Sequence, residues 1–265
     1  MPLDGKIVLI TGAGSGIGQA LARELASHGA RLLLVGRRVE ALEATRASLP
    51  DPRHGMVLAG DITDPHTRAA LATKVSTLGR LDILINNAGL VETGPLRADD
   101  AFRRRRMVEI NLLAPIELTM ALLPILRASA PARIVNVGSM FGDIAFPGFA
   151  AYSATKFGLR GWSEGLRREL APSRVAVSYA APRGTRTPAA EGFAELASAL
   201  AMPLDPPEKV AQQIVAGIRR GARDIYPNGP ERWFVLLQRL MPGLIDRVLI
   251  RRTAGVIAAL STEPA

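Results

Sequence analysis

Residues 6–18 read KIVLITGAGSGIG, an apolar run that ends in a glycine-rich turn. A helical pattern follows the turn and ends at Ser27-His28-Gly29, where a glycine suits a helix C-terminus. Glycines let the backbone approach a ligand closely, and a helix N-terminus offers free N–H groups. This strand, turn and helix are therefore suited to cradling a phosphate group. The alternative is a tight turn that binds no ligand.

The spacing of the turn narrows the kind of phosphate site. It reads TGxxxGxG, through Thr11, Gly12, Gly16 and Gly18, and differs from the GxGxxG fingerprint. No Gly-Lys-Ser/Thr follows, so the turn is not a nucleotide-triphosphate loop. We therefore expect the three glycines to hold the pyrophosphate of a dinucleotide.

Apolar runs and helical patterns alternate along most of the chain. The runs are continuous, which is typical of parallel strands covered on both faces. The sequence predicts one doubly wound α/β domain over 1–265 with a helical C-terminal extension over 231–265. A kink or break is expected at Pro115 and Pro124. We expect strands over 6–11, 31–35, 55–59, 81–86, 133–137, 174–179 and 224–226, helices over 37–49, 64–78, 99–128, 152–171 and 207–220, and an irregular stretch over 182–207.

Composition excludes several classes of protein. The chain has no cysteine, which excludes disulfides and Cys-ligated metals, and we predict no metal site. We see neither a signal peptide nor an apolar run of about 18 residues, so we expect a soluble, cytoplasmic protein. The net charge of +9 includes Arg103-Arg104-Arg105-Arg106. No nucleic-acid module accompanies this run, so a solvated helix face or an oligomer contact is preferred to nucleic acid.

Tyr152 and Lys156 lie four residues apart, so they share one face of a predicted helix. A free phenol has a pKa of about 10. A neighbouring ammonium stabilises the phenolate, so we expect Lys156 to lower the pKa of Tyr152 and make it a usable acid or base. Ser139 is a candidate to hold a substrate oxygen. The alternative is a surface helix that happens to carry a tyrosine and a lysine.

The end of the second strand bears on the type of cofactor. A carboxylate there binds the ribose 2′-hydroxyl of NAD, whereas an arginine suits the 2′-phosphate of NADP. The sequence has Arg37 and Arg38 at this point and no acid. A guanidinium holds phosphate bidentately, so NADP(H) is favoured over NAD(H). Ser15, in the glycine turn, adds no second positive charge.

Six motifs follow one another in a fixed order. They are TGAGSGIG at 11–18, Asp61-Ile62, Asn86-Asn87-Ala88-Gly89, Asn111, Ser139 and Tyr152-xxx-Lys156. In this set and order the chain resembles the single-domain form of the short-chain dehydrogenase/reductase family over about residues 5–190. The resemblance implies a Rossmann-like fold and hydride transfer between a nicotinamide and a carbonyl or alcohol.

The resemblance also implies a role for each matching position. Tyr152 would be the general acid/base, Lys156 would lower its pKa and bind the nicotinamide ribose, and Ser139 would position the reacting oxygen. Asn111 would anchor a water that relays protons. With the glycine turn and the arginines, the expected cofactor contacts are Gly12, Ser15, Gly16, Ile17, Gly18, Arg37, Arg38, Asp61, Ile62, Asn87, Ala88, Gly89, Tyr152, Lys156, Pro182, Thr185 and Thr187.

One segment departs from the family pattern. After the sixth strand the family has Pro-Gly, a short spacer and Thr, whereas this chain reads PRGTRT over 182–187. Arg183 stands at the usual glycine position. Gly184, one place later, is the alternative source of flexibility, and an altered substrate mouth is a consequence to be tested.

Residues 188–203, PAAEGFAELASALAMP, stand where the family carries a mobile substrate lid. Its Phe193, Leu196, Leu200 and Met202 either close over an apolar ligand or pack on the core. Aromatic residues between Ser139 and Tyr152 suit the same site. We expect a hydrophobic substrate, and the candidate contacts are Ser139, Met140, Phe146, Tyr152 and Phe193.

The tail over 231–260 mixes apolar residues with arginines, and Pro242-Gly243 divides it into two short predicted helices. We favour packing on the core or on another subunit, and weak contact with a membrane surface is the alternative. The leading function is an NADP(H)-dependent oxidoreductase that acts on a small molecule as a homo-oligomer. The alternatives are an NADP-binding regulatory protein with little turnover and a membrane-peripheral protein.

Overall fold

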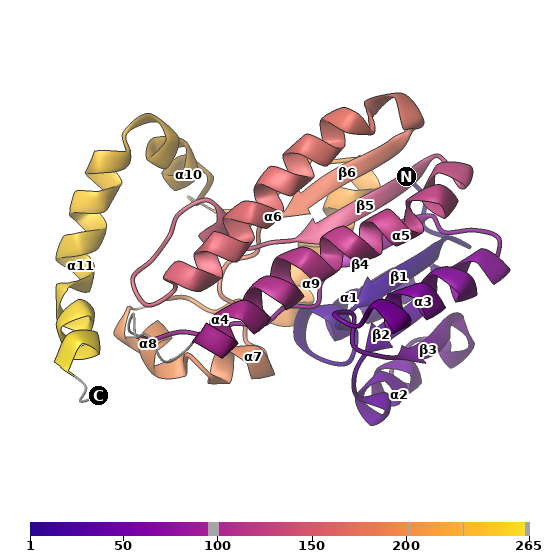
Figure 1. Cartoon of the computed structure of the whole chain (residues 1–265), viewed down its shortest axis with the longest axis horizontal. Helices are drawn as coiled ribbons and strands as arrows, with labels where there is room; N and C mark the ends of the chain where they lie inside the picture. Colours follow the sequence, from indigo (N-terminus) through magenta and orange to yellow (C-terminus); the bar gives the residue numbers. More distant parts are fainter. Residues whose placement is uncertain (95–100, 201, 230, 263–265) are drawn as a thin grey trace.

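The computed structural model describes residues 1–94, 101–200, 202–229 and 231–262. A parallel sheet of seven strands runs through its centre in the order β3-β2-β1-β4-β5-β6-β7 (Figure 1). The sheet confirms the predicted fold class. The strands are β1 Ile7–Thr11, β2 Arg31–Gly36, β3 Gly55–Ala59, β4 Ile83–Asn86, β5 Ala132–Val137, β6 Val175–Ala180 and β7 Asp224–Ile225.

Helices cover both faces of the sheet. Successive residues of β1 show this, because Val8 and Ile10 belong to one core cluster and Leu9 to another. Helices α1, α2 and α9 supply the first cluster and α3, α5 and α6 the second. The helices are α1 Gly16–Ser27, α2 Val39–Ala47, α3 Pro65–Thr77, α4 Ala101–Val108, α5 Ala114–Ala128, α6 Ala150–Glu169, α7 Pro188–Glu191, α8 Ala194–Ala199, α9 Pro207–Arg220, α10 Glu231–Leu240 and α11 Pro242–Thr262.

The strand order places the site. β1 pairs with β2 on one side and with β4 on the other, so the order of the strands reverses between β1 and β4. In doubly wound sheets, ligands bind beyond the carboxyl ends of the strands at this reversal. The glycine turn after β1 and the Asn87-Ala88-Gly89 turn after β4 both lie there.

The predicted long helix up to Ala128 is interrupted before Pro115 and not at either of its prolines. A π-helical segment, Glu109–Leu113, separates α4 from α5. Pro115 follows the π-helical segment closely and has no N–H to donate to the preceding turn, and Pro124 lies inside α5. The predicted start at Asp99 lies outside the described residues.

The helical stretch Ala101–Ala128 is long and apolar enough to cross a membrane by length and composition alone. This corrects the expectation that no such run exists. Its apolar residues have another explanation, since Leu118, Leu122 and Leu126 are fully buried in the core cluster shared with α3 and α6. A core helix of a soluble protein passes the same test.

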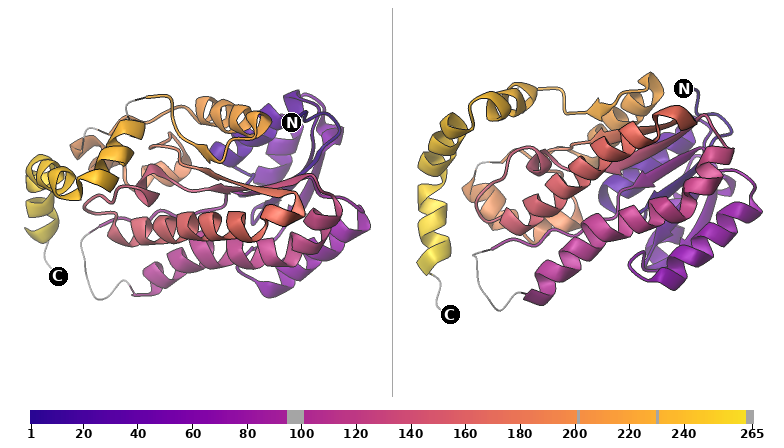
Figure 2. Two further views of the ribbon diagram at one scale, coloured as in Figure 1. Left: turned by 90° about the horizontal axis from the view of Figure 1, so that it is seen from above. Right: turned by 45° about the horizontal axis from the view of Figure 1, so that its top comes forward.

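The C-terminal extension forms two helices at one end of the molecule (Figure 2). The break falls at Met241, next to the predicted Pro242-Gly243. Only α10 is short, because α11 spans 21 residues. Val235 and Ile245 are buried against Met140 and Ile144, so the inner face of the extension packs on the body of the protein. The stretch 182–207 is likewise more regular than predicted, since it contains α7 and α8.

Candidate active site

A single cavity of about 570 Å³ joins the predicted site residues. It begins at the glycine turn and the end of β2, and passes Asn87 and Gly89. It then reaches Ser139, Tyr152 and Lys156, and ends between the loop after β6 and helices α10 and α11. Apart from Gly18 and Asn111, every residue expected to be catalytic or to contact the cofactor or substrate lines this cavity.

The glycine turn leaves space that side chains would fill. Gly12 and Gly16 have positive φ angles of 68° and 54°, which other residues rarely adopt. A Cβ on Gly18 would lie 2.1 Å from the carbonyl oxygen of Gly12, and one on Gly16 would lie 2.8 Å from Cγ2 of Thr187. The hydroxyl of Ser15 does not cap α1. Backbone N–H groups at this helix end therefore line a cradle that fits a dinucleotide pyrophosphate.

Asn87 links the turn after β4 to the glycine turn by hydrogen bonds. Its Nδ2 donates to the carbonyl oxygen of Thr11 at 2.9 Å, and the N–H groups of Asn87 and Ala88 both donate to Oγ1 of Thr11 at 3.0 Å. The side-chain amide therefore fixes the relative position of two cavity walls.

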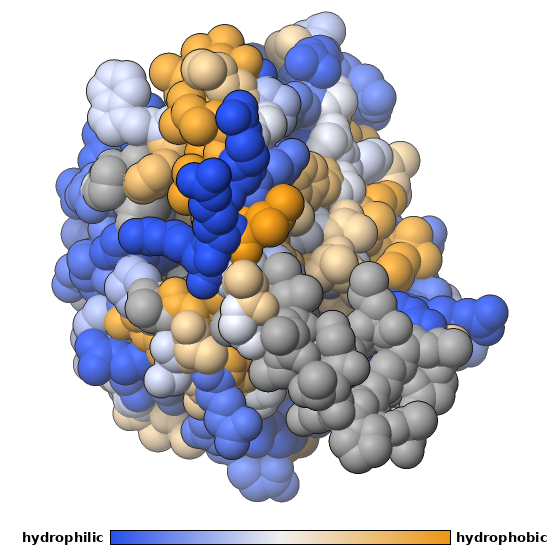
Figure 3. All heavy atoms as spheres, turned by 90° about the vertical axis from the view of Figure 1, so that its left-hand side faces the viewer, coloured by the Kyte–Doolittle hydropathy of each residue, from blue (hydrophilic) through white to orange (hydrophobic). Residues whose placement is uncertain are grey.

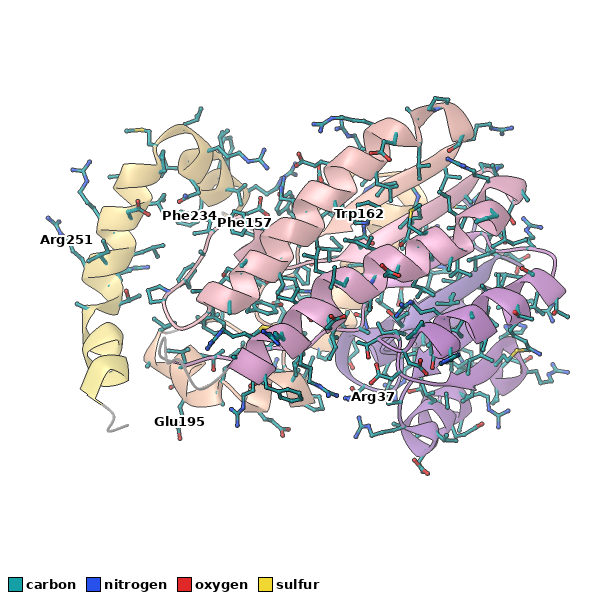
Figure 4. All side chains as sticks on the ribbon, viewed as in Figure 1. Arg37, Phe157, Trp162, Glu195, Phe234 and Arg251 are labelled. Atoms are coloured by element: carbon teal, nitrogen blue, oxygen red, sulfur yellow. The ribbon has the colours of Figure 1, made fainter. Side chains whose placement is uncertain are left out.

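The end of the cavity that is expected to hold the adenosine is lined by Arg37, Arg38, Asp61 and Ile62. Figure 4 shows Arg37 after the end of β2. The carboxylate of Asp61 accepts hydrogen bonds from the backbone N–H and hydroxyl of Thr63, at 3.0 and 2.8 Å. Asp61 is therefore held within its own turn, and Arg37 and Arg38 supply positive charge at this end.

Tyr152 and Lys156 project from α6 toward the end of β5, with Nζ of Lys156 5.7 Å from the centroid of the phenol ring. Nζ also donates to the carbonyl oxygen of Val137 at 3.1 Å. Ser139 follows β5 and its hydroxyl hydrogen-bonds with Tyr152. The fold thus brings Ser139, in the segment after β5, to the Tyr152 and Lys156 pair on α6.

Burial governs the protonation of this pair. Tyr152 is 8% exposed and Lys156 4%. Loss of water disfavours the phenolate and raises the pKa of Tyr152 to about 12, although the hydrogen bond from Ser139 opposes the rise. Burial lowers the pKa of Lys156 to about 8. The net pKa of Tyr152 therefore lies above its ordinary value because desolvation is the largest cause, and the effect of Lys156 on that pKa stays a prediction.

Asn111 lies in the π-helical segment and its side chain makes three hydrogen bonds. Its Oδ1 accepts from the N–H of Leu90 at 2.7 Å, and Nδ2 donates to the Leu90 carbonyl at 2.8 Å and to the Thr155 hydroxyl at 3.1 Å. A Cβ on Gly89 would lie 3.4 Å from Oδ1 of Asn111 and 3.7 Å from Nζ of Lys156. Asn111 therefore positions the loop beside Lys156 and holds it against α6.

The departure at Arg183 has a structural explanation. Its guanidinium forms an ion pair with Asp205, at the far end of the lid segment. The Thr185 hydroxyl donates to the Arg183 carbonyl at 2.9 Å, so it is turned toward its own loop. Gly184 lies close to Leu204, whose Cδ2 would be 2.7 Å from a Cβ there.

An aromatic cluster forms the wall beside Tyr152. The Phe141 ring lies 4.7 Å from that of Phe149 and makes an edge contact with Tyr152 at 6.2 Å. Phe193, from the lid segment, meets Phe149 edge-on at 5.5 Å. Met140 and Phe146 complete this apolar wall.

Sequence reasoning did not find the polar cluster behind Ser139. Asp143 pairs with Arg160 at 2.5 Å and accepts from the Tyr226 hydroxyl at 3.1 Å, and Arg239 of α10 lies 3.6 Å from it. The Tyr179 hydroxyl hydrogen-bonds with the backbone of Ser139. The spacing held a signal, because Asp143 and Arg160 each follow a catalytic candidate by four residues.

Comparison with known proteins identifies the family of this chain. A family model described as short chain dehydrogenase matches residues 6–196. The chain belongs to the short-chain dehydrogenase/reductase family. It is 30% identical over 264 residues to Dehydrogenase/reductase SDR family member 7B of Mus musculus, covering 94% of this chain and 82% of the relative.

Two solved structures extend the comparison. A short-chain dehydrogenase from Burkholderia cenocepacia J2315, in complex with NADP, has a TM-score of 0.81 at 27% identity, covering 94% of this chain and 99% of that one. A short chain dehydrogenase/reductase from Burkholderia phymatum, in complex with NAD, has a TM-score of 0.82 at 24% identity, covering 92% and 96%. This second likeness shows the common fold. As a member of this family, our chain is an NAD(P)-dependent oxidoreductase.

Proposed function

We propose that this enzyme uses NADP(H) to interconvert a carbonyl and an alcohol on a hydrophobic small molecule, with Tyr152 as the general acid/base. The observation that carries the proposal is the single cavity that joins the glycine cradle, the Ser139–Tyr152–Lys156 group and an apolar wall. The glycine cradle would hold the cofactor, the apolar wall would hold the substrate, and Tyr152 lies between them.

The cofactor, when bound, supplies or accepts the hydride. In reduction, Tyr152 donates its phenolic proton to the substrate oxygen, while Ser139 holds that oxygen by a hydrogen bond. These interactions strengthen as negative charge develops on the oxygen, which is where they lower the barrier. The pKa of Tyr152, raised to about 12, keeps the phenol protonated at neutral pH, the form that reduction requires.

Lys156 and Asn111 support this step. The Lys156 ammonium donates to the carbonyl of Val137 and lies 5.7 Å from the centroid of the Tyr152 ring. From there it stabilises negative charge on Tyr152 after the phenol has donated its proton. Asn111 fixes Gly89 and its loop beside Nζ. We propose that a water anchored near Asn111 returns the proton.

The preference for NADP(H) rests on Arg37 and Arg38, with no acid at the end of β2. The preference for a hydrophobic substrate rests on the aromatic wall and on Phe193 and Met202 of the lid segment. We also propose a homo-oligomer, which is common for enzymes of this kind.

The test is a spectrophotometric screen of NADPH oxidation and NADP reduction across hydrophobic carbonyls and alcohols. Tyr152→Phe should lower kcat by at least about 100-fold and leave the Kd of NADPH within about twofold. Near wild-type turnover in this variant would reject Tyr152 as the acid. Binding of NADPH with no turnover of any substrate would instead favour a regulatory role.

A further inference from the structure

The outer surface of the C-terminal helices is apolar although it faces solvent. Trp233, Leu236 and Leu240 lie at positions i, i+3 and i+7 of α10, so they form one stripe along the helix. Trp233 is 73% exposed and Leu240 71%. Met241, Leu244 and Val248 continue the exposed apolar surface into α11. We call these six residues the tail surface.

The tail surface is additional to the face that packs on the enzyme. Val235 and Ile245 are each 6% exposed and belong to the cluster around Met140. Arg239 also reaches Asp143 behind Ser139. Because the inner face of α10 already packs on the enzyme, the Trp233 stripe faces solvent. Exposed apolar surface of this extent marks a site of association.

The charges beside the tail surface indicate the partner. Over the tail at 231–260 the sequence has five arginines, one aspartate and one glutamate, a net charge of +3 (5 − 2). Arg251 points outward from α11 (Figure 4). At this end of the molecule, hydrophobic residues lie beside a row of hydrophilic side chains (Figure 3). A second copy would bring like charges together across a two-fold interface, whereas an anionic bilayer is complementary to both features.

We propose that the tail surface docks on an anionic phospholipid bilayer, with Trp233 and Leu240 entering the interface and Arg247 and Arg251 meeting lipid phosphates. Phe234 and Leu249 line the end of the cavity, and Val248 of the tail surface lines it too, so docking would place that end at the membrane. On the proposed function, the substrate class is then a lipophilic carbonyl or alcohol that partitions into the bilayer.

The first test is co-sedimentation of the full chain with vesicles of phosphatidylcholine alone or with phosphatidylglycerol. Binding should require the anionic lipid and weaken with salt. Trp233→Ser with Leu240→Ser should weaken it by about tenfold or more, and Arg247→Gln with Arg251→Gln by about fivefold per arginine. Met241→Ser should weaken it too. The matched control is Met120→Ser on α5, exposed to 52% against 54% for Met241, which should have no effect.

The second test uses tryptophan emission from the folded protein. The chain has two tryptophans, Trp162 and Trp233, so Trp162→Phe leaves Trp233 as the only reporter. Anionic vesicles should shift its emission to the blue, and brominated acyl chains should quench it. The Trp233→Phe protein should show neither change.

Three results would overturn the proposal. They are absence of binding to anionic vesicles, equal binding by the tail variants, and a blue shift that appears with protein concentration when no vesicle is present. The last would assign the tail surface to a second copy. Turnover of a water-soluble carbonyl without vesicles tests the proposed function separately, and its loss in Tyr152→Phe does not depend on docking.

Discussion

Arg183 and Asp205 form a two-point ion pair, with Nε 2.6 Å from Oδ2 and Nη2 3.0 Å from Oδ1. The backbone closes the same point, because the N–H of Asp205 donates to the Gly184 carbonyl at 2.8 Å and the N–H of Arg186 donates to the Asp205 carbonyl at 2.9 Å. The segment between them carries Phe193 and Met202 into the cavity. Arg183, which departs from the family pattern, therefore joins the two chain positions that flank residues 188–203.

We expect Asp205→Asn to loosen the lid while leaving the cofactor site intact. The amide cannot pair with the guanidinium as a carboxylate does, so KM for a hydrophobic substrate should rise about fivefold, equivalent to about 1 kcal/mol. The Kd of NADPH should change by less than about twofold. The control is Lys209→Met, which removes a half-exposed partner of the same carboxylate and should change KM little. Equal KM values in all three proteins would contradict the role.

The same pair predicts an acid-dependent stability. Arg183 is the main cause that holds the pKa of Asp205 below its ordinary value. A carboxyl whose folded pKa is lowered stabilises the fold above its ordinary pKa, and this contribution is lost as the pH falls through the folded value. The Tm difference between wild type and Asp205→Asn should therefore be constant from pH 6 to 8 and shrink below about pH 4. A difference that grows in acid would contradict this origin.

Lys156→Met should remove activity and raise stability at pH 7. The buried lysine has a pKa of about 8 against an ordinary 10.5, a cost of about 3 kcal/mol that a neutral side chain avoids. The Val137 carbonyl then loses its donor, at about 1 kcal/mol, which leaves a net gain of about 2 kcal/mol.

The pH dependence of that gain provides the check. Between pH 8 and 10.5 the unfolded chain binds more protons at Lys156 than the folded protein, so wild-type stability rises with pH in this window. The free energies of unfolding of wild type and Lys156→Met, measured in urea, should therefore differ most at pH 7 and least near pH 10. A constant difference would show that burial of the ammonium is not its cause.

Gly18→Ala should destabilise the enzyme and abolish dinucleotide binding. Its Cβ would lie 2.1 Å from the Gly12 carbonyl oxygen and 2.6 Å from Nδ2 of Asn87, so the turn must open. We expect a loss of about 3 kcal/mol or more. Gly161→Ala, on α6, is the control, because no atom lies within 4 Å of its added Cβ and alanine favours a helix by up to about 1 kcal/mol. Urea unfolding and NADPH titration of both variants provide the measurement.

The sequence predicts the sheet and the site chemistry because both depend on local patterns. Buried parallel strands are continuous apolar runs, and the residues at their carboxyl ends, such as Ser139 after β5, necessarily gather at one edge. Arg183 could not be interpreted in this way, because its partner lies 22 residues later across an irregular segment. The pKa of Tyr152 was also beyond sequence reasoning, since it depends on how far the fold removes water. The spacing of apolar residues in α10 can be read from the sequence. Only the burial of Val235 shows that the face with Trp233 is the exposed one.

Cofactor preference offers the sharpest test of the adenosine end. Arg37→Ala and Arg38→Ala should each raise the Kd of NADPH about tenfold or more, since each removes a guanidinium available to the 2′-phosphate. The Kd of NADH should stay within about twofold, because NADH lacks that phosphate. Arg31→Ala, at the opposite end of β2, is the control for loss of positive charge alone and should change neither value. Titration by nicotinamide fluorescence at two salt concentrations measures all of these constants. Equal weakening of NADH and NADPH would show that the arginines shape the pocket without reading the phosphate, and tighter NADH binding by the wild type would reject the NADP preference itself.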